Sequence, residues 1–177
     1  MAQTRSFRRI LVRILRHRWL DESDTRKAIP PQLVDRLMHR VAASERRHSG
    51  QIRIYVEAGL PMSYLWRGAG ARERAVALFG KLRVWDTESN NGVLIYLLLA
   101  EHAIEIVADR GIDRHIPLED WQAMIAHMRA AFREGRFEEG LTQALEEISA
   151  VLVEHFPLAP GESNPNELPD TPTVGPR

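Results

Sequence analysis

Oxygen-bearing side chains gather in two polar segments of the chain, on either side of two apolar segments. The first polar segment carries Asp86, Glu88, Asn90 and Asn91, and the second carries Asp109 and Asp113. The apolar residues between them would pair as an antiparallel hairpin with a turn at 100–102, so that paired residue numbers sum to about 202. Such a hairpin brings both polar segments to one end of a sheet. Oxygen ligands suit hard cations, so the sequence predicts a calcium or magnesium site at this end.

The first of these loops has the spacing of a calcium loop without being a complete one. From Asp86 to Gly92 it reads Asp-x-Glu-x-Asn-Asn-Gly, with candidate ligands at alternate positions. An EF-hand needs Gly at loop position six and Glu at position twelve, where this chain has Asn91 and Leu97. Two other interpretations stay open. The same residue types form turns without any ligand, with Arg110 and Arg114 as counter-charges, and the loops could also take an organic ligand.

The chain offers little for covalent catalysis. It has no cysteine, which excludes disulfides, thiolate nucleophiles and thiolate zinc sites. Its seven histidines are scattered and Ser89 has no histidine close in sequence. Hydrolysis would therefore need water activated by a metal ion, and Asp86 and Asp109 are the residues expected to hold that ion. These residues are compatible with an enzyme and with a non-enzymatic protein.

Charge is distributed unevenly along the 177 residues, although the net charge is zero. Residues 1–58 hold 13 Lys/Arg against 6 Asp/Glu, a net of +7, whereas residues 84–177 hold 6 against 17, a net of −11. The two ends could attract each other within the fold or serve different partners.

The N-terminal residues predict a basic amphipathic helix. Apolar residues at helical spacing from Phe7 to Trp19 alternate with Arg8, Arg9, Arg13 and Arg16. This helix could dock on its own domain, or its arginines could contact a protein partner or an anionic membrane surface. No nucleic-acid partner is expected, because interleaved aromatics on a strand platform are missing. No segment has the length of a membrane span or the pattern of a signal peptide, so we expect a cytoplasmic protein, peripheral at the inner face of the membrane.

Three segments follow from the pattern along the chain. Residues 1–29 are the basic helix and a polar linker, residues 30–156 are a folded domain, and residues 157–177, with six prolines, are expected to be disordered. Within the domain, helices and strands alternate so that the whole chain reads α-α-β-α-β-β-α-α. Three strands with helices before, between and after them predict a three-layer α/β/α sandwich around a small mixed β-sheet, with residues 93–99 in its middle.

Several short motifs, in one order and spacing, resemble the TPM domain family over residues 30–156. They are Glu45-Arg46-Arg47-His48-Ser49-Gly50, Val84-Trp85-Asp86-Thr87-Glu88, Asn90-Asn91-Gly92-Val93-Leu94, Asp109-Arg110-Gly111-Ile112 and Phe132-Arg133-Glu134-Gly135-Arg136-Phe137. The resemblance implies an α/β/α sandwich of the short soluble subgroup, without signal peptide or membrane anchor. Some members of the family are reported to bind calcium, and some plant members to be acid phosphatases. Gln51 and the Asp109-Arg110-Gly111 turn depart from the usual pattern, which has Glu and Gly-aromatic-Gly there.

Two functional hypotheses follow. The first is a non-enzymatic binding or scaffold module of TPM type, with one divalent cation at the loops 86–92 and 109–113. The alternative is a metal-dependent acid phosphatase that acts on phosphomonoesters.

Overall fold

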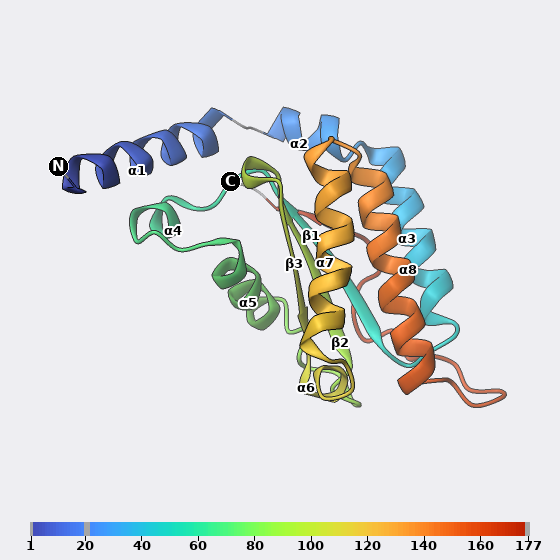
Figure 1. Cartoon of the computed structure of the whole chain (residues 1–177). Coiled ribbons are helices and arrows are strands. Elements are labelled where there is room, and N and C mark those ends of the chain that lie inside the picture. The colour runs from blue at the N-terminus through green and yellow to red at the C-terminus, as the bar shows by residue number, and fades with distance from the viewer. Residues whose placement is uncertain (1, 20–21, 176–177) are drawn as a thin grey trace.

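The computed structural model describes residues 2–19 and 22–175, with side chains described from residue 11 onward except for 20–23 (Figure 1). Its helices and strands follow in order as α1 Ala2–Trp19, α2 Glu22–Ala28, α3 Pro31–Glu45, β1 Gln51–Glu57, α4 Met62–Trp66, α5 Ala71–Lys81, β2 Gly92–Leu98, β3 Ala103–Ala108, α6 Arg110–Asp113, α7 Leu118–Arg133, α8 Phe137–His155 and β4 Thr173–Val174. A 3-10 turn over Leu99–Glu101 joins β2 to β3. The predicted polar linker is in part the short helix α2.

The sheet has the order β3-β2-β1-β4 and is mixed, as predicted. Strand β2 runs parallel to β1 and antiparallel to β3, and β4 runs parallel to β1. In the hairpin, Val93 pairs with Ala108, one residue away from the register expected from the sequence. All seven residues of β2 are buried, because the strand lies between two neighbours and under helices on both faces.

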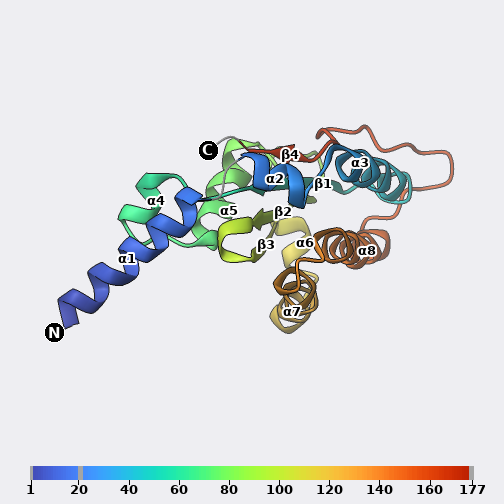
Figure 2. The ribbon, with the colours of Figure 1, turned by 90° about the horizontal axis from the view of Figure 1, so that it is seen from above.

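Helices cover both faces of the sheet and form two hydrophobic cores (Figure 2). Alternate residues of β2 divide between the cores, since successive side chains of a strand point to opposite faces. Ile95 and Leu97 pack in the core under α3, α7 and α8, whereas Leu94 and Tyr96 pack in the core on the side of α4 and α5. This confirms the predicted α/β/α sandwich.

The C-terminal segment differs from its predicted disorder. After an exposed loop over residues 159–163, residues 164–175 return along the domain, where Leu168 is buried and β4 extends the sheet beside β1. The Arg53 guanidinium donates hydrogen bonds to the carbonyls of Pro169 and Thr171 and to the Thr173 hydroxyl. Prolines prevent periodic hydrogen bonding within this segment, so side chains of β1 supply the partners instead.

Gln51 fixes the start of that segment. Its fully buried side chain donates from Nε2 to Asn164 Oδ1 and accepts at Oε1 from the Leu168 N–H, 3.0 Å away. Asn164 in turn donates to the carbonyls of His48 and Gly50. A glutamate at position 51 could accept the Leu168 hydrogen bond, but an ionised carboxylate has no hydrogen to donate to Asn164. The departure from the family pattern at this position therefore matches the packed C-terminal segment.

Two buried titratable groups lie where α3 meets β1. The Glu45 carboxylate accepts a hydrogen bond from the Ile52 N–H at 2.8 Å, and burial raises its pKa to about 8 against the opposing effect of that bond. Burial lowers the pKa of the His48 imidazole to about 4. His48 donates from Nδ1 to the Gly50 carbonyl, 3.1 Å away, so Nε2 accepts from the Ser44 hydroxyl at 2.7 Å.

We predict that Gln51→Glu loosens the C-terminal segment. The charged side chain loses its bond to Asn164 and places a carboxylate in a site without solvent, so amide hydrogen exchange over residues 164–175 should rise at least about tenfold. Gln122→Glu, the same substitution on the exposed face of α7, serves as control. Unchanged exchange in the Gln51 variant would show that this side chain does not hold the segment.

We also predict that Glu45 makes stability fall between pH 6.5 and pH 8. The folded state keeps the Glu45 proton up to about pH 8, whereas the unfolded chain loses it near its ordinary pKa of 4.5, so the folded state binds more protons in this window. His48 adds little pH dependence in this window, because its imidazole loses its proton near pH 4 in the folded state and near pH 6.5 in the unfolded chain.

The comparison that isolates this effect is Glu45→Gln against wild type in urea denaturation at both pH values. The wild type should lose stability by up to about 1.4 kcal/mol per pH unit relative to the variant. Glu154→Gln, on the exposed face of α8, should follow the wild type. Parallel curves for wild type and Glu45→Gln would contradict the prediction.

Candidate functional site

The two polar loops meet at the start of β2, as the predicted hairpin requires. The Asp109 N–H donates to the Gly92 carbonyl and the Gly111 N–H to the Asn90 carbonyl, each at 2.9 Å. The first loop reaches this position through two left-handed residues, Arg83 and Asn90, with φ of 56° and 52°. Gly92 is not among the residues with positive φ.

Two glycines let the loops approach this closely. A Cβ on Gly92 would lie 1.9 Å from the Val84 carbonyl oxygen, and a Cβ on Gly111 would lie 2.3 Å from the Asn90 carbonyl oxygen. Both contacts are with backbone, which cannot move aside as a flexible side chain can. The Gly of Asp109-Arg110-Gly111 thus serves loop packing, while Asp109 caps the short helix α6 by accepting from the Arg110 N–H at 2.6 Å.

Asn91 and Asp109 each bury one oxygen without a partner at this junction. Asn91 is fully buried, its N–H donates to Thr87 Oγ1 and its Nδ2 donates to Ser49 Oγ, but Oδ1 has no hydrogen bond among the described residues. Asp109 is 7% exposed, and its Oδ2 likewise has no partner in the described part of the chain. Unsatisfied buried oxygens are costly and call for a ligand such as water or a cation.

The other four predicted ligands are placed differently. Asp86 is exposed and forms an ion pair with Arg83, Nη2 to Oδ2 at 2.5 Å. Glu88, Asn90 and Asp113 are exposed, and the Glu88 N–H donates to the Glu167 carboxylate at 3.1 Å. Within residues 2–19 and 22–175 no three His, Cys, Asp or Glu side chains are grouped so that they could hold a metal ion. The structure therefore brings Asn91 and Asp109 together at the loop junction and leaves the remaining candidates at its surface.

This arrangement can bind a cation better than it can perform catalysis. One carboxylate oxygen and one amide oxygen, completed by water, suit a hard ion that keeps part of its hydration shell. Ser49 accepts the Asn91 hydrogen bond, and among the described residues no histidine bonds its hydroxyl. Asp86, expected to share an activating metal with Asp109, is paired with Arg83 instead.

A buried chain of hydrogen-bonded serine and histidine side chains, which was not predicted from the sequence, lies beside this site. Ser44 bonds both His48 and Ser149, and all three side chains are at most 4% exposed. The spacing of Ser44 and His48, four residues apart at the end of a helix, was the available signal. These three side chains are too buried for a substrate to reach them. The hydrogen bond between Ser44 and Ser149 connects α3 to α8, so we assign the group a structural role.

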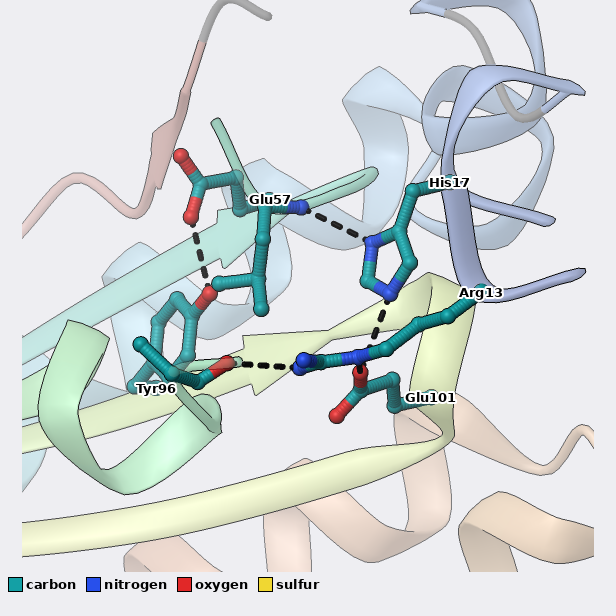
Figure 3. A network of polar contacts seen from close by, with 7 residues as sticks. Arg13, His17, Glu57, Tyr96 and Glu101 are labelled. Carbon is teal, nitrogen blue, oxygen red and sulfur yellow. Dashed lines mark hydrogen bonds and ion pairs between the residues drawn. The ribbon is translucent and has the colours of Figure 1, made fainter. Parts of the chain in front are cut away.

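Helix α1 docks on the opposite end of the sheet through polar contacts (Figure 3). Arg13 donates to Glu101 Oε1 from Nε and to the Ala69 carbonyl from Nη2, each at 2.7 Å. His17 accepts from the Leu60 N–H at Nδ1 and donates to Glu101 from Nε2, each at 3.0 Å. The hydrogen bonds from His17 and Arg13 lower the pKa of the Glu101 carboxyl.

The outward face of α1 is apolar and exposed. It carries Leu11, Val12, Leu15 and Trp19, of which Trp19 is 83% exposed. Among the four arginines expected to bind a partner, Arg13 serves docking and Arg16 is exposed, while the side chains of Arg8 and Arg9 lie outside the described ones. Short helix α4, which packs against α1, adds exposed Met62 and Trp66. None of the described helices combines the length and the apolar character that a bilayer crossing requires.

Comparisons with known proteins agree with this fold. The NMR structure of BA42 protein from the psychrophilic bacterium Bizionia argentinensis is similar with a TM-score of 0.72 and 24% identity, over 83% of this chain and 95% of BA42. The N-terminal domain of a P. gingivalis protein, solved by NMR, is similar with a TM-score of 0.59 and 19% identity, over 74% of this chain and 83% of that domain. At these identities the likeness concerns the fold. No curated protein matches the chain.

A family model gives the assignment. The model described as TPM domain matches residues 23–151, which is most of the chain and includes both polar loops, the hairpin and helices α3, α7 and most of α8. The predicted resemblance is confirmed, and the chain belongs to the TPM domain family.

Proposed function

We propose that this protein is a non-enzymatic TPM-type binding module that holds one divalent cation, calcium or magnesium, between the loops 86–92 and 109–113. The observation that carries the proposal is the pair of buried, unpartnered oxygens, Asn91 Oδ1 and Asp109 Oδ2, on the two loops. A cation that contacted both oxygens would satisfy them together, and it would also balance a carboxylate oxygen that is otherwise desolvated without a donor.

The loops are held in place before any ligand arrives. Gly92 and Gly111 allow backbone contacts that no other residue would permit, and the Asp109 and Gly111 amides bond the facing loop. A fixed loop pair loses little conformational entropy when an ion binds. The site has few protein ligands, so we expect moderate affinity and several retained waters.

The second part of the proposal concerns helix α1. We propose that its exposed face contacts a protein partner or an anionic membrane surface, in a cytoplasmic protein that is peripheral at the inner face of the membrane. The support is the outward exposure of Leu11, Val12, Leu15 and Trp19 beside Arg16. Large exposed apolar side chains grouped on one helix face are typical of interaction surfaces.

Calcium titration followed by amide NMR tests the cation site. Shifts should concentrate at residues 90–92 and 109–111, and Asp109→Asn should weaken binding at least about tenfold, because Asn still caps α6 but loses the charge. Asp113→Asn, on the exposed side of the same loop, should change affinity less than about twofold. Absence of shifts at millimolar calcium and magnesium would contradict the site.

An aryl phosphate assay separates this proposal from the phosphatase hypothesis. We expect no metal-dependent hydrolysis at acidic or neutral pH, since Asp86 is paired with Arg83 rather than placed with Asp109. Turnover that needs metal and disappears in Asp109→Asn, with the Asp113→Asn control active, would overturn the non-enzymatic assignment. Turnover unaffected by either substitution would point to a contaminating enzyme and leave the assignment in place.

A further inference from the structure

A cationic cleft lies at the hairpin end of the sheet, away from the two polar loops. It is bounded by α1, by the turn between β2 and β3 and by α7. The residues that line it are Arg16, Glu101, His102, Ala103, Arg129 and Arg133. Three arginines from two distant parts of the chain therefore surround one cavity.

The carboxylates near the cleft do not neutralise these arginines. Glu101 is occupied by Arg13 and His17, at 2.7 and 3.0 Å. Glu105 divides its two oxygens between Arg72 and Arg129, at 3.9 and 3.8 Å, so each of these pairs is long. Arg16 and Arg133 have no acidic partner within ion-pair distance among the described side chains. The cleft keeps a surplus of positive charge.

The arrangement on α7 adds to this surplus. Arg129 and Arg133 are four residues apart on one helix, so their side chains lie on the same face and repel each other. Arg133 gains from the negative end of the helix, but Arg129 lies one turn further back. An anion bound between the two guanidinium groups would attract both of them and offset their mutual repulsion.

The turn residue His102 gives the cleft a fixed rim. It has a left-handed backbone with φ of 47°, uncommon for a residue with a side chain, and its Nδ1 donates to the Phe132 carbonyl at 3.0 Å. That bond ties the turn to α7 beside Arg133. Nε2 has no hydrogen-bond partner among the described residues.

We propose that this cleft binds the phosphate group of an anionic phospholipid while the outward face of α1 lies in the membrane interface. Guanidinium groups match phosphate oxygens in geometry and charge. Arg16 is on the same helix as exposed Leu15 and Trp19, so one docking event would satisfy the arginines and cover the apolar face. Figure 2 shows α1 projecting beyond the domain, where a flat surface could reach it.

A soluble phosphate fits the cleft less completely than a lipid does. It would satisfy the arginines but would leave Leu11, Val12, Leu15 and Trp19 in water. A Trp at the end of a basic amphipathic helix is typical of helices that lie in the headgroup region. The inference rests on the proposed partner role of α1 and is independent of the cation site at the other end of β2.

Vesicle co-sedimentation of the full chain tests the inference, in EDTA so that the cation site is empty. Phosphatidylcholine vesicles with phosphatidylglycerol should bind the wild type, and pure phosphatidylcholine vesicles should not. Arg129→Gln/Arg133→Gln should weaken binding at least about tenfold. The control Arg46→Gln/Arg47→Gln removes the same charge from exposed positions just before β1, at the opposite end of the sheet, and should weaken it less than about threefold.

Trp19→Ser should weaken vesicle binding as well, because the apolar face takes part, while the unfolding midpoints of all variants stay close to that of the wild type. Equal losses of vesicle binding in both double variants would contradict binding in the cleft and would indicate a diffuse attraction between the charged protein and the vesicle. Binding of glycerol 3-phosphate by NMR without vesicle binding would replace the lipid by a soluble phosphate. Self-association abolished by Trp19→Ser, with no vesicle binding, would make a second copy of the chain the occupant.

Discussion

Enclosure of strand β2 is the constraint on which the rest of the structure depends. Every residue of the strand is buried, and its two faces feed separate cores. Burial of this kind stabilises the fold by about 25 cal/mol for each Å² of apolar surface removed from water. It also fixes the ends of the strand. At one end Gly92 allows the backbone to approach the Val84 carbonyl closely. At the other end the turn places Glu101 where Arg13 of α1 donates a hydrogen bond to it. The proposed cation site and the arginine-lined cleft therefore lie at opposite ends of strand β2.

Periodicity and apolar runs were enough to predict the sandwich, because they report directly on burial. The hairpin register was predicted to within one residue from its turn. That prediction correctly brought Asn91 and Asp109 to one end of the sheet. It could not show that Asp86 pairs with Arg83 or that Arg83 has a left-handed backbone, since no local pattern indicates either feature. The same holds for the C-terminal segment, whose order comes from Gln51 and Arg53, more than a hundred residues away.

Buried polar groups at the loop end of β2 are of two kinds: some have hydrogen-bond partners within the protein and others have none. Gln51, His48 and Glu45 all have hydrogen-bond partners, and burial shifts the pKa of the two titratable groups, His48 and Glu45. Asn91 Oδ1 and Asp109 Oδ2 have none in the described chain. Three further described side chains, Trp121, Glu147 and Asp170, also bury one polar atom without a partner. Asn91 Oδ1 and Asp109 Oδ2 lie on the two facing loops and are available as acceptors for a ligand.

Helix α1 is docked in an unusual sense, with charged residues inward and large apolar residues outward. An amphipathic helix normally buries its apolar face on its own domain. Here Arg13 and His17 make polar contacts with the domain, and among the apolar side chains described from residue 11 to 19 only Ile14 reaches the core beside α4 and α5. Contacts of this type weaken with salt and contribute less than apolar burial. Polar docking orients the helix and leaves its apolar face available, which is the property a surface for another molecule requires.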